Sequence, residues 1–237
     1  MQKSQKLYTI YQDIQNCHLC SAMDREKSLR LLDAVSSHSD VFIISQALAE
    51  NQLRKSGVNF FQADGSLGST GASLEGFLNK FNRTVYPGQE VKISDTVTIP
   101  HSDPHYKPVY NTEIAQCYPG KNTAKKGDRK PTGDEIQTCI RQGFLMQEIT
   151  LIQPKLLLLM GKASRDSFFD YFLKAGYPQS LTSHLSEITR AGNIPECSLG
   201  NSSAYVLPIQ HASGLNPRFP SMMNDKRLVD LIKGVLE

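Results

Sequence analysis

Four cysteines in a divided arrangement are the residues of this chain best suited to bind a metal. Cys17 and Cys20 form a C-x2-C pair near the start, and Cys117 and Cys139 follow about a hundred residues later. Four soft thiolates suit either a tetrahedral zinc ion or a cubane iron-sulfur cluster, and the number of sulfurs does not distinguish the two. The pattern therefore predicts one metal site that joins the start of the chain to a segment about a hundred residues later. We expect the fifth cysteine, Cys197, to be a loop or packing residue.

A second group of chemical interest lies at residues 210–217, which read Gln-His-Ala-Ser-Gly-Leu-Asn-Pro. A lone histidine after a strand is usually structural. Here His211 is accompanied by Ser213, whose hydroxyl could hold a phosphate, and by Leu215, whose apolar side chain could wedge into a base stack. This combination indicates contact with a nucleic acid.

A basic stretch at residues 121–130 points the same way. The formal net charge of +3 is too small to indicate nucleic-acid binding by itself, but five cations gather in this stretch. They are Lys121, Lys125, Lys126, Arg129 and Lys130. Such a segment is ordinarily a solvated loop. Because the His211 segment also points to nucleic acid, we interpret the basic stretch as a phosphate-binding segment.

The elements that must position these residues alternate between strands and helices. Short apolar runs predict strands at residues 40–45, 109–114, 155–160 and 204–209. Helical spacing predicts helices at 73–81 with Ser73 as N-cap, at 134–152, from 161 to about 173, and at 225–236. This order predicts an α/β fold, a three-layer α/β/α sandwich with a central, mostly parallel four-stranded sheet. Residues 91–99 alternate with period two and predict a small hairpin insertion.

Ligands of such sheets bind where the parallel strands end. The loops that follow the predicted strands begin at residues 45, 116, 161 and 210. The first, second and fourth of them carry unusual polar residues, so we expect the site between these three loops.

Length and composition favour one domain over residues 1–237, in which residues 1–39 form a cluster-binding helical segment and residues 121–130 a basic insertion. The chain begins with a polar segment and has no apolar run of membrane-spanning length. We therefore expect a soluble cytoplasmic monomer with reduced thiols and no membrane partner.

Three blocks of the sequence resemble the uracil-DNA glycosylase superfamily, most closely its iron-sulfur family-4 branch. The first block contains Ser45-Gln-Ala-Leu-Ala49 and Gly57-Val-Asn-Phe60, the second runs from Tyr110 to Cys139, and the third is Pro208-Ile-Gln-His-Ala-Ser213. With the N-terminal C-x2-C pair, the blocks stand in family order and cover nearly the whole chain. The resemblance implies a 4Fe-4S cluster on Cys17, Cys20, Cys117 and Cys139, with zinc as the alternative.

The resemblance also implies a mechanism in which a nucleotide is flipped out of DNA and its N-glycosidic bond is hydrolysed. His211 would donate to the departing base, and Phe60 would stack on that base. Gln46 and the backbone of Ala47 would line the pocket and place the water. Leu215 would fill the gap in the base stack. The DNA backbone contacts would come from Ser213, Lys125, Lys126 and Arg129.

The chain departs from the family pattern at two places that affect chemistry. The first motif of the family usually reads Gly-Glu-Ala-Pro-Gly, whereas this chain has Ser45-Gln-Ala-Leu-Ala49 and no evident general base. Glu113 stands where the family commonly has the Asn that reads uracil. An ionised carboxylate only accepts hydrogen bonds, so Glu113 suits a base with an exocyclic amine, unless Asn111 takes over the reading.

These observations leave three hypotheses about function. The first is a monofunctional DNA glycosylase of base-excision repair that removes uracil or another damaged base. The second is a catalytically weak or silent DNA-binding protein with the same fold. The third is a zinc-stapled α/β protein that binds a nucleotide.

Overall fold

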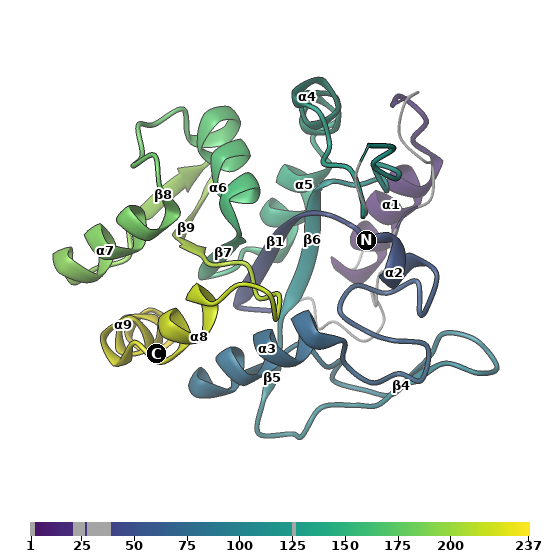
Figure 1. Cartoon of the computed structure of the whole chain (residues 1–237), viewed down its shortest axis with the longest axis horizontal. Helices are drawn as coiled ribbons and strands as arrows, with labels where there is room; N and C mark the ends of the chain where they lie inside the picture. Colours follow the sequence, from purple (N-terminus) through teal and green to yellow (C-terminus); the bar gives the residue numbers. More distant parts are fainter. Residues whose placement is uncertain (1–2, 21–26, 28–38, 125–126) are drawn as a thin grey trace.

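A five-stranded sheet forms the centre of the computed structural model, which describes residues 3–20, 27, 39–124 and 127–237 (Figure 1). The strands follow the order β6, β1, β7, β9, β8. Neighbours among the first four are parallel, and β8 runs antiparallel to β9 at one edge. The bounds are β1 (Val41–Ala47), β6 (Tyr110–Ala115), β7 (Leu156–Met160), β8 (Glu196–Leu199) and β9 (Ser202–Ile209).

Helices cover both faces of the sheet, which explains why its central strands are continuous apolar runs. In β1, Val41 and Ile43 belong to one core cluster and Phe42 and Ile44 to another, and all four side chains are fully buried. The first cluster is closed by α3 (Ser69–Leu78), α7 (Leu181–Ala191), α8 (Arg218–Met223) and α9 (Lys226–Leu236). The second is closed by α1 (Lys3–Asn16), α4 (Gly133–Arg141), α5 (Phe144–Ile152) and α6 (Lys162–Phe168). The predicted three-layer α/β/α sandwich is confirmed.

The sheet has one strand more than the four that the sequence predicts. The additional strand, β8, reads Glu-Cys-Ser-Leu and has a single neighbour at the sheet edge. Only Leu199 of this strand is buried, so no continuous apolar run marks it. Cys197 lies in β8, half-buried against the second cluster, and is therefore a packing residue in a strand rather than in a loop.

Two helix predictions need correction. The single helix expected at 134–152 is two helices, α4 and α5, because Gly143 adopts a left-handed conformation with φ 74° between them. Thr132 starts α4 with a capping box that it shares with Glu135. Ser73 is not an N-cap, since α3 already begins at Ser69 after Gly68.

The remaining elements are short. The predicted hairpin is present as the antiparallel pair β3 (Val91–Lys92) and β4 (Thr98–Ile99). The others are α2 (Glu50–Leu53), η1 (Asn79–Phe81), β2 (Arg83–Thr84), β5 (Lys107–Pro108) and the π-helical turn η2 (Phe169–Leu173). Among the described residues, no helix has the length and apolar composition needed to cross a bilayer.

Candidate functional site

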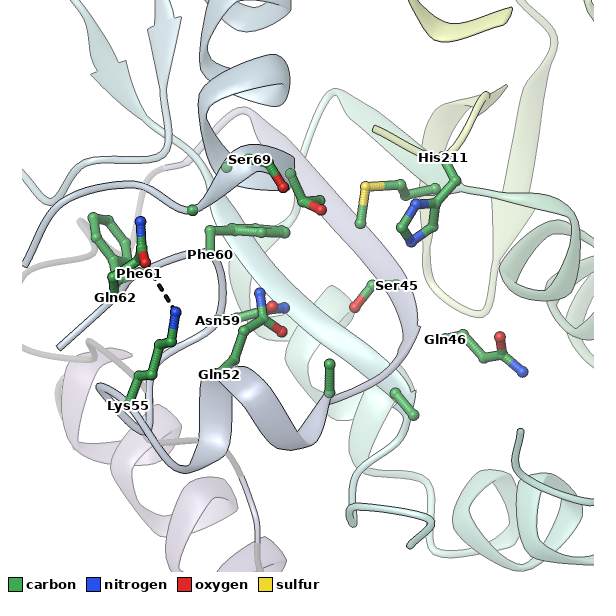
Figure 2. Close-up of a pocket in the computed structure, with 16 residues that line it drawn as sticks. Ser45, Gln46, Gln52, Lys55, Asn59, Phe60, Phe61, Gln62, Ser69 and His211 are labelled. Carbon is green, nitrogen blue, oxygen red and sulfur yellow. Dashed lines mark hydrogen bonds between the residues drawn. The ribbon is translucent and has the colours of Figure 1, made fainter. Parts of the chain in front are cut away.

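A cavity of about 510 Å³ opens where β1 ends, and Figure 2 shows the residues around it. This volume lies in the usual range of small-molecule sites. Phe60 and His211 face each other across the cavity, and Ser45 lies between them. The remaining lining residues are Gln46, Ala47, Ala49, Gln52, Lys55, Asn59, Phe61, Gln62, Gly68, Ser69, Thr70, Gly71 and Met160. Residues of the first and fourth predicted loops therefore line this cavity.

Phe60 reaches the cavity from a tight and strained turn. The amide of Phe61 donates to the carbonyl of Val58 at 3.3 Å, which places Asn59 and Phe60 at the two central positions. Phe60 has φ 74°, a conformation that costs a bulky residue about 1–3 kcal/mol. The buried hydroxyl of Ser56 donates to the Phe61 carbonyl at 2.7 Å and fixes the turn. Strain of this kind, held by its surroundings, is typical of functional sites.

Helix α3 holds the same turn from the other side. The amide of Gly68 donates to the Phe60 carbonyl at 2.8 Å. A Cβ on Gly71 would lie 2.7 Å from that carbonyl oxygen, closer than the backbone permits. Gly71 is therefore the position that lets the helix approach the Phe60 turn.

We expect Gly71→Ala to lower the free energy of unfolding by about 1–3 kcal/mol, because the added methyl group must push the Phe60 turn away. Urea unfolding followed by circular dichroism measures the change. Gly76→Ala is the matched control on the same helix, since its Cβ would meet only Met223 Sδ at 4.0 Å. This control should stabilise the protein by up to about 1 kcal/mol. Equal effects of the two substitutions would contradict the close approach at Gly71.

His211 presents one ring nitrogen to the cavity. The amide of Ser213 donates to His211 Nδ1 at 3.2 Å, so the neutral ring carries its proton on Nε2. Desolvation lowers the pKa of His211, although the residue as a whole is exposed. The ring packs over Gly161, whose φ of 88° and missing side chain leave room for it. The arrangement makes His211 a neutral Nε2–H donor near neutral pH.

The turn that follows His211 exposes the apolar side chain of Leu215 to solvent. Leu215 is 95 % exposed, the largest exposure among the exposed large hydrophobic residues of the described chain. The amide of Asn216 donates to the Ser213 carbonyl at 3.0 Å, and the Asn216 side chain donates to the His211 carbonyl at 3.0 Å. These bonds hold Leu215 out on a tight turn beside half-buried Ser213.

The end of β1 supplies polar but uncharged groups. Gln46 and Ala47 both line the cavity, as the sequence predicts, and Gln46 lies on the His211 side in Figure 2. Within the described residues, the cavity wall contains no carboxylate. An amide can hold and orient a water molecule but is a poor base, so any attacking water here would be positioned rather than deprotonated.

Glu113 and Asn111 are not on the cavity wall. Glu113 is fully buried in β6, and its Oε1 accepts a hydrogen bond of 3.0 Å from Asn59 Nδ2. Asn111 is two residues earlier on the same strand, opposite Ile43 of β1, and farther from the strand end. Asn59, the hydrogen-bond partner of Glu113, lines the cavity instead. The sequence analysis did not single it out. Its contact with Glu113 joins residues 54 positions apart and leaves no local signal in the sequence.

The structure brings the four predicted metal-binding cysteines together. Burial, together with electrostatic interaction with Cys20, Cys117 and Cys17, raises the pKa of Cys139 to about 12. The pKa values of Cys20 and Cys117 are likewise raised, first by burial and also by neighbouring cysteines. Cys117 and Cys20 pack with Ala47, so the cysteine group adjoins the end of β1 that lines the cavity.

A buried lysine accompanies the cysteines. Lys27 is 8 % exposed, and its ammonium donates to the carbonyls of Gln15 at 3.3 Å and Cys17 at 3.0 Å. The same ammonium donates to the Cys117 thiol, and its charge partly opposes the rise in the pKa values of Cys117 and Cys20. Its positive charge therefore offsets the negative charge that thiolates would bring, a role that sequence reasoning missed.

The cysteine group is not arranged around one ion. In the described part of the chain, no three His, Cys, Asp or Glu side chains are placed so that they could hold a metal ion. Four thiols are the donor set of a 4Fe-4S cluster and equally that of a structural zinc ion.

The basic insertion is tied to the body of the protein by ion pairs. Arg129 makes a bidentate pair with Glu135 at 2.6 and 2.8 Å, and Lys121 Nζ lies 2.7 Å from Glu50 Oε2. Asp128 accepts a bond of 3.1 Å from the amide of Glu50 at the start of α2. Arg129 is thus paired with Glu135 in the folded protein, whereas the sequence predicted that it contacts DNA phosphate. Lys125 and Lys126 lie outside the described residues.

One known protein family matches the sequence of this chain. The family model of the Uracil DNA glycosylase superfamily matches residues 32–233. The match spans all five strands of the sheet and both walls of the cavity. No curated protein matches the chain.

Proposed function

Because the chain belongs to the uracil DNA glycosylase superfamily, we propose that it hydrolyses the N-glycosidic bond of a deaminated base in DNA. The observation that carries this proposal is the pair of Phe60 and His211 on opposite walls of the cavity. An aromatic face and a neutral N–H donor are what a flipped base needs, one to stack on and one to accept its developing charge.

The reaction follows from these two side chains and the end of β1. As the bond between C1′ and the base breaks, electrons move into the base and the sugar acquires oxocarbenium character. The Nε2–H of His211 donates to the base oxygen that gains negative charge. A water held by Gln46 adds its hydroxyl group to C1′ and releases a proton to solvent. The departing base takes up a proton, and the products are a free base and an abasic site.

The exposed Leu215 supports binding of a base-flipped duplex. An apolar side chain on a tight turn next to the cavity can enter the base stack and occupy the space that the flipped nucleotide leaves. Ser213 on the same turn supplies a hydroxyl group for phosphate contact.

We expect Leu215→Ala to slow base release from duplex DNA by about tenfold and to leave release from single-stranded DNA nearly unchanged. Only a duplex has a stack that must be held open, which costs a few kcal/mol. Single-turnover assays on the same sequence in both forms measure the two rates. An equal loss on both substrates would contradict the wedge role.

We also propose that Cys17, Cys20, Cys117 and Cys139 hold a 4Fe-4S cluster. The mutual proximity of the four thiols and the ammonium of Lys27 beside them support this assignment. The cluster would link the N-terminal segment to the chain just after β6 and to the last turn of α4. Its role would be structural, since the cysteine group adjoins the cavity through Ala47 and does not line it.

A catalytically silent DNA-binding protein is the second candidate, and one observation favours it. The cavity wall within the described ranges has no carboxylate that could activate water. A substrate panel separates the two candidates: single- and double-stranded oligonucleotides with uracil, hypoxanthine, xanthine, ethenocytosine and oxidised bases, each treated with protein and then with alkali. A glycosylase leaves an alkali-sensitive abasic site in at least one of them. DNA binding without any strand break would support the silent protein.

A further inference from the structure

Asn59 is the most buried polar residue on the wall of the cavity in the described part of the chain. It is 5 % exposed, it lines the cavity, and it stands next to Phe60 on the strained turn. Figure 2 shows it below the Phe60 ring, next to Gln52. A side chain at this position can read the base by hydrogen bonds.

Glu113 fixes the direction of the Asn59 amide. Asn59 Nδ2 donates to Glu113 Oε1 at 3.0 Å, and Glu113 is fully buried behind it. Rotating the amide by half a turn would bring Asn59 Oδ1 against the carboxylate, where two acceptors would repel each other. The orientation with Nδ2 toward Glu113 is therefore the one that satisfies both groups.

The remaining polar atoms of Asn59 are left for a ligand. Among the described residues, His184 Nδ1 is the one buried side-chain polar atom without a partner. Asn59 Oδ1 accepts no hydrogen bond within those residues, so it is open to the cavity that Asn59 lines. The second N–H of the amide is also left over, because one N–H is used by Glu113. The Asn59 amide thus presents one hydrogen-bond acceptor and one hydrogen-bond donor, side by side, to the cavity.

The backbone of Glu113 is held as firmly as its side chain. Gln116 Nε2 donates to the Glu113 carbonyl at 2.6 Å and to Thr112 Oγ1 at 3.2 Å. Glu113 also pairs with Ser45 in the ladder between β6 and β1. The backbone of Glu113 is therefore anchored to the central sheet.

We propose that Asn59 is the residue that selects the base, and that Glu113 acts through it as a positioning residue that locks the amide. This inference rests on the proposed glycosylase function and names its substrate class. The fixed amide accepts from a ring N–H and donates to the adjacent carbonyl oxygen. Uracil and hypoxanthine present that pair, which deamination creates from cytosine and adenine; xanthine, guanine and thymine present it too. Cytosine and adenine present a ring acceptor beside an amine, and matching them would require the rotated amide.

The test compares binding of two single-stranded oligonucleotides that differ at one base. One carries 2′-fluoro-2′-deoxyuridine and the other 2′-fluoro-2′-deoxycytidine, because fluorine at C2′ disfavours the oxocarbenium sugar and keeps the base attached. Both have the same phosphates, so the ratio of their Kd values reports the reading of the base. We expect the wild-type protein to favour the uracil strand by roughly 5- to 150-fold, the discrimination of one good two-bond contact.

Asn59→Ala should bring the ratio close to one. Glu113→Gln should lower it several-fold, because a glutamine amide can donate or accept and so permits both orientations of Asn59. Asn201→Ala is the matched control, the same chemical change at an exposed asparagine in the turn between β8 and β9 outside the cavity, and it should keep the wild-type ratio. A general loss of fold would weaken binding of both strands and leave the ratio intact.

The outcomes separate this inference from the proposed function. A wild-type protein without preference, or a preference that survives in Asn59→Ala, would overturn the inference even if base release is observed. A preference that Asn59→Ala abolishes, in a protein that releases no base from the substrate panel, would uphold the inference and overturn the proposed function.

Discussion

We expect His211→Ala to lower the single-turnover rate of base release by about 100- to 1000-fold. Loss of one preorganised donor to a developing oxyanion has this effect in other enzymes, because no water in the site replaces it at the same place. The neutral Nε2–H of His211 is set by the amide of Ser213, which occupies Nδ1. The ring makes no other bond that would explain a structural requirement for it among the hydrogen bonds of the described residues.

Two controls make this result specific. His105→Ala removes an exposed histidine that pairs with Asp103 outside the cavity, and it should leave the rate unchanged. Binding of the fluorinated uracil strand to His211→Ala should stay within about threefold of the wild type, since the donor acts mainly on charge that develops in the transition state. A His211→Ala protein that retains more than a third of the rate would exclude His211 as the donor.

The second large effect concerns the cysteine group. Protein purified without oxygen should be brown and contain about four iron atoms and four sulfide ions per chain, as a 4Fe-4S cluster requires. Cys139→Ser should remove the iron and lower the Tm by roughly 10 °C or more, because binding at a structural metal site contributes directly to folding.

Cys197→Ser is the matched control for the cysteine substitution. Cys197 is half-buried in β8 and packs against the second core cluster, whereas Cys139 lies among the other thiols. Its replacement should leave colour and iron content unchanged. A colourless protein with one zinc ion per chain would contradict the cluster, and equal effects of the two substitutions would show that Cys139 is not a ligand.

The central sheet could be predicted from the sequence because its signal is local. β1 and β7 are continuous apolar runs, and burial on both faces is what such runs indicate. The edge strand β8 gives no such signal because only Leu199 of it is buried. The break between α4 and α5 depends on one glycine with positive φ inside an otherwise periodic helical pattern.

The candidate site was predictable only in part, for a related reason. His211, Phe60 and Leu215 belong to motifs that can be seen in short stretches of sequence. The roles of Asn59 and Lys27 depend on partners distant in the chain, Glu113 for the first and Cys117 for the second. A lysine is also the residue least expected in a buried position, and only its carbonyl and thiol partners account for it here. Contacts of this kind appear only in the folded chain.

The central claim, that this cavity removes a deaminated base from DNA, is tested most directly by detecting the free base. Wild-type protein is incubated in excess with an oligonucleotide that contains one uracil, and the small-molecule fraction is analysed by mass spectrometry. The account predicts release of one free uracil per strand, with an abasic site left in the DNA and a rate that depends on His211. Intact uracil-containing strands that are nevertheless bound by the protein, in the single-stranded and duplex forms and with hypoxanthine and xanthine in place of uracil, would contradict it.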